Sequence, residues 1–545
     1  MNGSILVLIA ILIFGLAYRF YGKFLSNKYR IDRNRPTPSQ SYYDGVDYVP
    51  AKLPVLFGHH FASIAGAGPI VGTIVAAAFG WLPAALWIMA GSIFIGGTHD
   101  FGAIVVSLRH RGHSIANVIE KNIGVKGEQL FLLFCWATIV LVIAVFINII
   151  ADTFVSSPAS ATSSIYFILL AILFGLSIYR YKVPWGLATF IGVILLFAGI
   201  YLGIYFPIHA SRQFWQWTLL AYIFVASVAP VWILLQPRDY LNSFLLYALM
   251  AGGLIGVFFA HPSININTFN GFSVPNLGPL FPILFVTIAC GAISGTHSLI
   301  ASGTTSKQLQ SESHARVIGY GGMLVEGLLA ILSLVAVASL SATEFSELYN
   351  SKNFVMAFSE GISRFMNAIP FLHISVKSAR IFTTLAVSAF TLTSLDTVTR
   401  IGRYAFQEFF EMPDRAPEQQ NILARNRYLA TFITVVCGAA LTFSGKSDSI
   451  WPIFGSANQL MAALAFFAIS IWLAEIKENF MFTLIPGVIM LLITVTALFT
   501  LSYRNLISNQ NYILGLTAIL ILIMALSLTV KAFSFMIREA RNKKN

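Results

Sequence analysis

Apolar segments recur along the whole chain, and most of them are long enough to cross a lipid bilayer. A helix of about 20 residues spans the hydrocarbon core of a membrane. Runs of this kind along the 545 residues predict fifteen transmembrane helices, at residues 4–20, 58–79, 82–107, 129–153, 163–180, 185–206, 217–235, 240–260, 280–301, 316–341, 380–400, 427–443, 450–473, 479–502 and 511–532. The sequence therefore predicts an all-α integral membrane protein.

The composition argues against a soluble protein and against a nucleic-acid-binding protein. Charged residues make up 10% of the chain, whereas soluble domains carry about 25%. The formal net charge is +12, but the basic residues fall almost entirely between the apolar spans. Membrane topology explains basic residues in those places. We therefore expect the lipid bilayer to surround the chain, and we expect no binding of nucleic acid.

The distribution of Lys and Arg predicts the orientation in the membrane. If the first span runs from outside to inside, 27 of the 34 Lys and Arg residues fall in loops assigned to the cytoplasm. The excess then alternates loop by loop, and an error of one helix in the count would destroy that alternation. Because cytoplasmic loops are enriched in Lys and Arg, we expect the N-terminus outside and the C-terminus inside.

The second predicted span contains residues that interrupt a helix. Glycines lower helix propensity, and Pro69 removes one backbone hydrogen bond. One interpretation is a discontinuous helix whose freed backbone groups face a substrate or an ion. The other is a proline kink with close glycine packing. The candidate substrate-binding residues of this span are Gly58, His59, His60, Gly66, Gly68 and Pro69.

The ninth predicted span combines small hydroxyl residues with a histidine. Such residues suit the lining of a polar cavity, and they also suit close packing between helices. The second and ninth spans share the pattern Gly-x-His-x5-Gly and run in opposite directions, which fits an inverted repeat, although coincidence explains three matched residues equally well. The candidate substrate-binding residues here are Gly295, His297, Ser298, Ser302 and Thr304.

Three carboxylates fall inside predicted spans, where ionisable groups are costly and usually functional. Asp100 lies near the inner end of the third span, Glu326 lies in the tenth, and Asp396 lies near the inner end of the eleventh. All three are candidate ion-coupling residues. For Asp100 the alternative is a plain solvated charge, and for Asp396 it is a structural pair with Arg400 at i,i+4 spacing.

The sequence lacks the motifs of nucleotide hydrolysis and of zinc proteases. Neither Gly-x4-Gly-Lys-Ser/Thr nor His-Glu-x2-His is present, so uphill transport would depend on an ion gradient or on a separate subunit. An alternative of another class is an intramembrane metal enzyme, if His59, His60, His99 and His297 gather around one metal. Histidines within spans more often line cavities or relay protons, so we expect no metal, no cofactor and no catalytic residue.

Several motifs resemble those of the carbon starvation protein A (CstA) family of membrane transporters. They are Asp44–Pro50, Leu56–Pro69, Ala289–Thr305, Ser394–Thr397 and Trp451–Leu460, and they occur in the family's order over about residues 20–475. The resemblance implies residues 1–378 as a CstA-like N-terminal membrane region and residues 379–545 as a C-terminal membrane region of about five helices. It also implies an inverted-repeat bundle of the amino acid–polyamine–organocation type.

The same resemblance implies a function. Members of the family are regarded as secondary transporters of the cytoplasmic membrane that import small peptides during carbon starvation, whereas other members take up pyruvate with protons. We therefore expect a small-molecule substrate, either peptide or pyruvate, and H⁺ as the coupling ion. A helix N-terminus at the break would hold a carboxylate in either case, so these residues do not separate the two substrates. The oligomeric state stays open.

Overall fold

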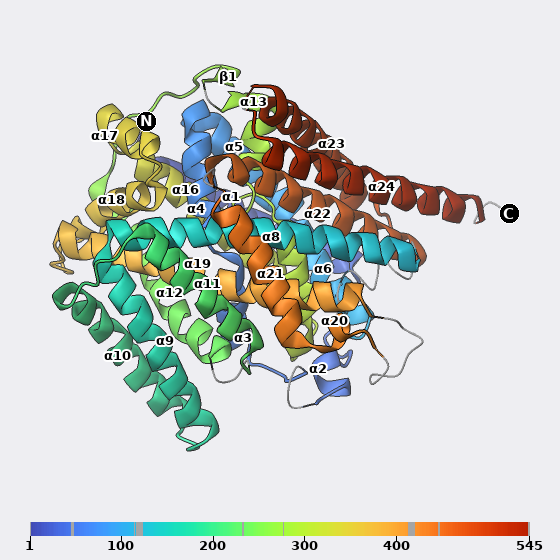
Figure 1. Cartoon of the computed structure of the whole chain (residues 1–545), viewed down its shortest axis with the longest axis horizontal. Coiled ribbons are helices and arrows are strands. Elements are labelled where there is room, and N and C mark those ends of the chain that lie inside the picture. Colours follow the sequence, from blue (N-terminus) through green and yellow to red (C-terminus); the bar gives the residue numbers. More distant parts are fainter. Residues whose placement is uncertain are drawn as a thin grey trace.

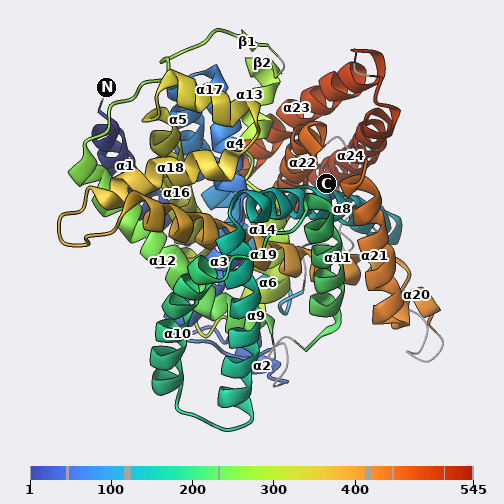
Figure 2. The same cartoon turned by 60° about the vertical axis from the view of Figure 1, so that its left-hand side comes forward.

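In the computed structural model the chain is almost entirely helical. The structure describes residues 2–44, 48–113, 115, 124–230, 234–275, 277–411, 420–444, 447–508 and 510–542. Two strands of two residues each form a small antiparallel hairpin, and the other elements labelled in Figures 1 and 2 are helices joined by loops. The elements are α1 (Gly3–Lys28), α2 (Pro38–Ser41), α3 (Leu53–Ile64), α4 (Gly68–Ala76), η1 (Ala77–Phe79), α5 (Trp81–Ala90), η2 (Gly91–Gly96), α6 (Gly97–Arg109), α8 (Val125–Ser156), α9 (Pro158–Tyr179), α10 (Trp185–Tyr205), α11 (Arg212–Val228), α12 (Leu235–Ala260), β1 (Ser273–Val274), β2 (Gly278–Pro279), α13 (Leu280–Thr287), α14 (Gly295–Ile300), η3 (Ala301–Thr305), α15 (Ser306–Gln308), η4 (Arg316–Gly321), α16 (Gly322–Ala338), α17 (Ala342–Asn350), α18 (Phe354–Asn367), α19 (Val376–Phe409), α20 (Ile422–Arg425), α21 (Arg427–Thr442), α22 (Ser447–Glu475), α23 (Met481–Tyr503), η6 (Arg504–Ser508) and α24 (Tyr512–Asn542).

Within the described residues, eleven continuous helices are long and apolar enough to cross a membrane. They are formed by α1, α5 with η2 and α6, α8, α9, α10, α12, η4 with α16, α19, α22, α23 with η6, and α24. The pair α3 and α4, bent by 43° at its break, makes a twelfth candidate. The multi-span helical architecture predicted from the sequence is therefore confirmed.

The other three predicted spans fall on helices that are short or interrupted. The span at 217–235 corresponds to α11, of 17 residues, and the span at 427–443 corresponds to α21, of 16 residues. The span at 280–301 is divided between α13 and α14. The count of fifteen spans thus stays a prediction, as does the orientation. The predicted division between residues 378 and 379 falls in the first turn of α19 and also stays a prediction.

The helices differ in how much of their surface is covered by other helices. In the most hydrophobic windows of α19 and α22, 94% of the residues are buried, whereas in α1 and α10 the share is 33%. In both views α9 and α10 form a hairpin at the edge of the molecule (Figures 1 and 2). The outward side chains of α10 include Phe190, which is 67% exposed. A helix that faces lipid tails presents apolar side chains of this kind.

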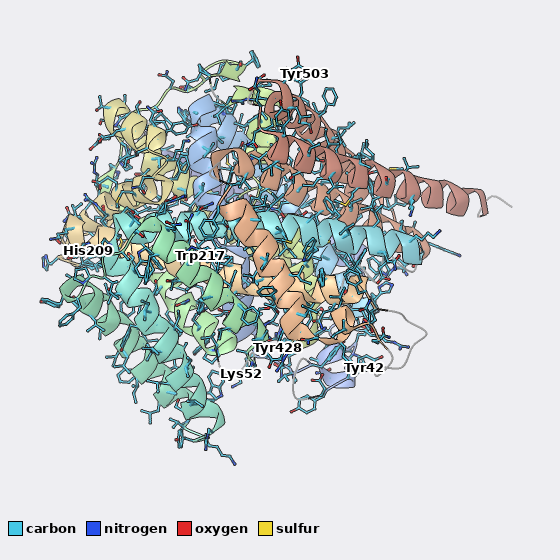
Figure 3. All side chains as sticks on the ribbon, viewed as in Figure 1. Tyr42, Lys52, His209, Trp217, Tyr428 and Tyr503 are labelled. Carbon is cyan, nitrogen blue, oxygen red and sulfur yellow. The ribbon has the colours of Figure 1, made fainter. Side chains whose placement is uncertain are left out.

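Large aromatic side chains are also exposed on other outer helices. Among the labelled residues in Figure 3, Trp217 on α11, Tyr428 on α21 and Tyr503 on α23 lie at the outer surface. Since more than half of each of these side chains is exposed in the described part of the chain, the surface they belong to fits a surrounding bilayer and its interfaces better than bulk water.

The long connection at residues 341–379 covers one end of the bundle. Its helix α18 buries an apolar face, including Phe358 and Ile362, against α12, α16 and α19. This packing makes the amphipathic helix α18 a cap on the bundle. Outside the spans, the Arg364 side chain donates hydrogen bonds to Glu344, which lower the pKa of that carboxyl to about 2.

Candidate functional site: two broken helices and two buried charge clusters

The two spans that the sequence singled out are both interrupted, and their interruptions lie side by side. The second span is helical as α3, breaks at residues 65–67 and continues as α4. The ninth is helical as α13, breaks at residues 288–294 and continues as α14. The first half of one span packs against the second half of the other, α3 against α14 and α4 against α13. The two spans therefore run antiparallel, with their breaks in contact.

Glycines allow the close approach of these segments. A Cβ atom on Gly68 would overlap the side chain of Cys290, and one on Gly72 would overlap the backbone carbonyl oxygen of Thr287. Pro69 occupies the first turn of α4, where a proline initiates a helix and has no hydrogen bond to lose. Pro69 thus starts the second half of a discontinuous span, which favours the broken-helix interpretation over a simple kink.

The remaining predicted glycines face other helices. Gly58 lies against Tyr247 of α12, Gly66 lies against Ser394 of α19, and Gly295 lies against the backbone of α22 at Asn458. At each of these positions a larger side chain would push the broken span away from the neighbouring helix.

Side-chain amides of α22 pair with the backbone at the break of the ninth span. Asn458 accepts a hydrogen bond from the backbone N–H of Thr296 at 2.9 Å and donates to the Ser294 hydroxyl at 2.9 Å. Gln459 donates to the carbonyl oxygen of Phe285 at 2.6 Å. Backbone groups within a membrane need partners, so this neighbouring helix stabilises the interruption.

A cluster of four charged or titratable side chains lies beside the breaks, and we call it the first cluster: His99, Asp100, His297 and Glu326. His297 Nδ1 is 2.9 Å from one Asp100 oxygen, and His99 Nδ1 is 2.7 Å from the other. On the far side of the His297 ring, Nε2 is 3.6 Å from a Glu326 oxygen. All four residues are at most 1% exposed. Three elements, α6, α14 and α16, thus place two carboxylates on opposite sides of one imidazole.

Some polar atoms of this region lack hydrogen bonds within the part of the chain that the structure describes. They are both oxygens of Glu326 and the Nε2 atoms of His60, His99 and His297. His60 Nδ1 is bonded to the Thr305 hydroxyl at 2.8 Å, and the ring lies over Gly322, one helical turn before Glu326. A buried polar group without a partner costs about 1–3 kcal/mol, so such a concentration is typical of a functional centre.

The predicted hydroxyl residues of the ninth span bond to their own helix. Ser298, Ser302 and Thr304 each donate to a backbone carbonyl three or four residues earlier, at 2.7, 2.5 and 2.9 Å. This local bonding is common for hydroxyl residues in apolar helices. Thr305, which the sequence analysis did not select, is the residue that contacts His60.

Asp396 belongs to a second buried cluster, which we define as His59, Tyr222, Arg238, Asp239 and Asp396. Arg238 forms an ion pair with Asp396 through Nη1 and another with Asp239 through Nη2, at 3.0 Å. The Tyr222 hydroxyl donates to Asp396 at 2.7 Å. His59 Nδ1 is 3.5 Å from the free oxygen of Asp239. The adjacent histidines of α3 therefore face different clusters.

Two observations in the second cluster differ from the sequence analysis. The partner of Asp396 is Arg238 and not Arg400, whose side chain instead donates to the carbonyl oxygens of Ala226 and Ala229 at the end of α11. Arg238 falls between the predicted spans 217–235 and 240–260, where a loop charge would be expected, but it is 1% exposed, in the first turn of α12. The sequence does contain a signal for this buried charge: Arg238 and Asp239 directly follow Pro237 at the start of an apolar helix.

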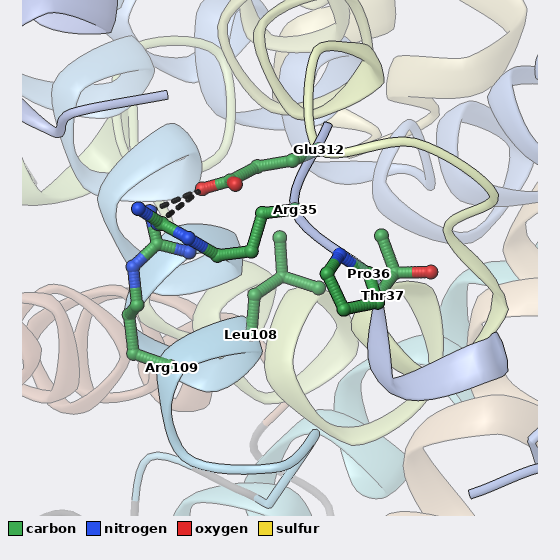
Figure 4. Close-up of a pocket in the computed structure, with 6 residues that line it drawn as sticks. All are labelled: Arg35, Pro36, Thr37, Leu108, Arg109 and Glu312. Carbon is green, nitrogen blue, oxygen red and sulfur yellow. Dashed lines mark hydrogen bonds and ion pairs between the residues drawn. The ribbon is translucent and has the colours of Figure 1, made fainter. Parts of the chain in front are cut away.

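A third group of charges lies at the surface end of α6 and borders a cavity of about 160 Å³. Figure 4 shows Arg35 and Arg109 converging on the carboxylate of Glu312. Glu312 is 1% exposed, and it joins the loop after α1, the end of α6 and the connector before η4. By the predicted orientation this group lies on the cytoplasmic side.

The four histidines considered as metal ligands do not gather at one point. His60, His99 and His297 belong to the region of the first cluster, and His59 faces the second. Among the described residues, no group of three or more His, Cys, Asp or Glu is placed to hold a metal ion. The geometry gives no support to the metal-enzyme alternative.

Comparison with known proteins places the chain in a family. The family model described as "Carbon starvation protein CstA" matches residues 2–357 and 346–497. The chain belongs to the CstA family. The protein named peptide transporter CstA from Escherichia coli K12 is 32% identical over 570 residues, covering 91% of this chain and 80% of the relative. The pyruvate/proton symporter BtsT of the same organism is 30% identical, with 90% of this chain and 81% of the relative covered.

The fold of this CstA-family chain resembles that of a solved transporter. A mutant manganese transporter from Eremococcus coleocola superposes with a TM-score of 0.50 at 12% identity, covering 89% of this chain and 95% of that one. At this identity the likeness concerns the fold alone. Together with the apolar spans, the family membership identifies a multi-pass integral membrane protein.

Proposed function

We propose that this CstA-family chain is a secondary active transporter that imports small peptides across the cytoplasmic membrane together with protons. The observation that carries the proposal is the meeting of two broken spans beside the buried first cluster. Breaks within the membrane free backbone groups to bind a substrate. Carboxylates buried within the membrane are typical of ion and proton pathways. The family name suggests that such uptake serves the response to carbon starvation.

The proposal includes the finer architecture. The fifteen spans, with the N-terminus outside and the C-terminus inside, would form an inverted-repeat bundle. Antiparallel packing of the two broken spans supports such a repeat. His60 precedes its break and His297 follows its break, so in antiparallel spans the two histidines lie on the same side of the breaks. Positions related by an inverted repeat lie on opposite sides, so the repeat is inferred from the packing of the spans and not from these histidines.

In this proposal the substrate binds at the breaks. Its surroundings are the glycines, histidines and hydroxyl residues predicted from the sequence, on α3, α4 and α14 with η3. Asp100 and Glu326 serve as coupling groups because His297 connects them. A proton on His297 interacts with both carboxylates, so protonation and charge balance of the first cluster depend on each other. Asp396 is the coupling candidate of the second cluster.

A second candidate function is proton-coupled uptake of pyruvate or another small carboxylate. The observation that favours it is the similarity to the pyruvate/proton symporter, whose identity of 30% is close to the 32% of the peptide transporter. Both substrates are small, and both carry a carboxylate, so the buried charges described above would serve either one.

Uptake into proteoliposomes tests the proposal and separates the two candidates. Purified protein would be reconstituted and supplied with labelled dipeptide, tripeptide or pyruvate, with and without an inward proton gradient. We expect peptide accumulation that depends on the gradient and is abolished by a protonophore. Accumulation of pyruvate without peptide would establish the second candidate. Absence of uptake for all three, by folded protein, would contradict both.

A further inference from the structure

Arg238 is a buried guanidinium group within reach of the broken second span. We propose that Arg238 binds the carboxylate of the transported substrate, and that Asp396 is the internal competitor for this position. The inference rests on the proposed function and names the chemical group by which the substrate would be recognised.

The guanidinium of Arg238 has more hydrogen-bonding capacity than its neighbours use. Nη1 contacts Asp396 and, at 2.5 Å, the hydroxyl of Tyr222, whereas Nη2 contacts Asp239. Within the described residues, Nε has no hydrogen-bond partner, and neither does the second oxygen of Asp396. The ion pair between Arg238 and Asp396 therefore uses one nitrogen and one oxygen, although a guanidinium and a carboxylate can form two parallel hydrogen bonds. Such a contact is replaceable by a carboxylate that binds through two oxygens.

The second cluster is connected to the break through two short contacts. Ser394, two residues before Asp396, donates to the carbonyl oxygen of Ser63, which lies in the last turn of α3 before the break of the second span. On the same half of that span, the His59 ring faces Asp239. Arg238 thus lies beside the helix that ends at the break, and a substrate bound there could extend its carboxylate towards it.

The charges of the second cluster also favour exchange. One guanidinium faces two carboxylates, so with both ionised the cluster carries one surplus negative charge. The titratable groups that face Arg238 and Asp396 are His59 from α3, Tyr222 from α11 and Asp239 from α12. If Asp396 takes up a proton, Arg238 keeps Asp239 as its partner and can accept the substrate carboxylate in place of Asp396. The total charge of the cluster is then the same before and after binding.

Recognition of a carboxylate explains how one family serves two substrate classes. Peptides and pyruvate differ in size and in most functional groups, but each carries a carboxylate. Arginine binds this group through a planar fork of donors that lysine lacks. A site built for such a contact discriminates strongly against an analogue that cannot make it, because its own polar groups would stay unpaired.

Binding to the purified protein tests this inference independently of transport. The probes are alanyl-alanine against its C-terminal amide, and pyruvate against pyruvamide, with ligand-induced thermal stabilisation as the readout. We expect at least one carboxylate to bind wild-type protein roughly ten to a hundred times more tightly than its amide, the value of a charge-assisted hydrogen bond. In Arg238→Gln the preference should disappear, and in Arg238→Lys it should be reduced.

Asp396→Asn keeps the test decisive if Arg238→Gln fails to fold. This variant leaves Arg238 paired with Asp239, so the buried charges stay balanced. Because the competitor is neutralised, carboxylates should bind more tightly and amides should bind as before. An unchanged carboxylate-to-amide ratio in Asp396→Asn would overturn the inference, and so would a wild-type protein that binds neither carboxylate. Binding that depends on Arg238 without gradient-driven uptake would contradict the proposed function alone.

Discussion

Asp100 and Glu326 are joined by one imidazole, and this arrangement assigns them testable roles. Replacement of Glu326 by Gln keeps the shape of the side chain but removes its ability to exchange a proton. We expect the accumulation ratio of substrate in proteoliposomes to fall to about one, since no coupling free energy from the proton gradient would remain. Exchange of labelled for unlabelled substrate, which needs no net proton movement, should persist.

Glu344→Gln is the matched control for this substitution. Glu344 lies on α17, outside the spans, with its side chain 41% exposed and paired with Arg364. Exposed ion pairs contribute about 0–1 kcal/mol, so this variant should accumulate substrate like the wild type. Accumulation that survives in Glu326→Gln, or is equally lost in Glu344→Gln, would contradict a coupling role for Glu326.

At this scale, sequence reasoning found the residues that stand out chemically from their surroundings. Asp100, His297 and Glu326 are ionisable residues within apolar spans, and the structure brings them together. Arg238 was missed because it lies at the end of a span, where a loop charge and a buried charge look alike. Its partner Asp396 is 158 positions away in the chain, and local spacing contains no information about such a pair.

At the scale of the helices, contact between α4 and α13 depends on the absence of a side chain at Gly72. In Gly72→Ala the new methyl group would overlap the carbonyl oxygen of Thr287, which is backbone and cannot rotate away. We expect a loss of stability of about 1–3 kcal/mol from overpacking, together with reduced uptake because the two breaks would separate. Thermal unfolding in detergent and uptake assays would measure the two effects.

Gly15→Ala provides the opposite expectation within the same protein. Gly15 lies in α1, and among the described residues no atom outside its own helix lies within 4 Å of a Cβ built there. Alanine is a better helix former than glycine by about 1 kcal/mol, so this variant should be neutral or slightly more stable. Equal behaviour of the two variants would show that close packing at Gly72 has no special importance.

The ends of helices were predictable from the sequence where local residue types determine them. They were less predictable where contacts with other helices determine them. Glycines followed by Pro69 predicted the break of the second span from local sequence. The break of the ninth span has no proline, and it is stabilised by Asn458 and Gln459, which come from α22. The lengths of α11 and α21 likewise fall short of the predicted spans, because the apolar run that defines a span continues beyond the helix.

At the scale of the whole molecule, the first cluster is closed off from the surroundings. The side chains of the first cluster are at most 1% exposed, and Cys290, at the break of the ninth span, is 6% exposed. A transported substrate has to reach this region from each side of the membrane in turn, so the helices around it must separate. The ion pairs of Glu312 with Arg35 and Arg109 hold together three segments on the predicted cytoplasmic side.

Alkylation of Cys290 by N-ethylmaleimide would report this opening. In a background with Cys135→Ala and Cys437→Ala, Cys290 is the one remaining thiol of the sequence. Glu312→Gln removes the partner of two arginines and should favour the opened arrangement. An exposed ion pair worth about 1 kcal/mol shifts a two-state equilibrium about fivefold, and breaking a pair with a buried carboxylate costs more. We therefore expect the alkylation rate to rise at least about fivefold.

Glu478→Gln separates an effect of opening from a general loss of surface charge. Glu478 pairs with Lys28 and Arg30 near the ends of α1 and α22, and it does not line the cavity beside Glu312. Arg30 contacts the cavity residue Arg109 through its backbone carbonyl, which Glu478→Gln leaves in place. Its neutralisation removes an ion pair with two basic residues, as in Glu312→Gln, but leaves Arg35 and Arg109 paired. The alkylation rate should therefore stay at the wild-type value. An equal increase in both variants would mean that Cys290 responds to loosening of the whole bundle. No increase in either would mean that the Glu312 ion pairs do not restrain the path to the breaks.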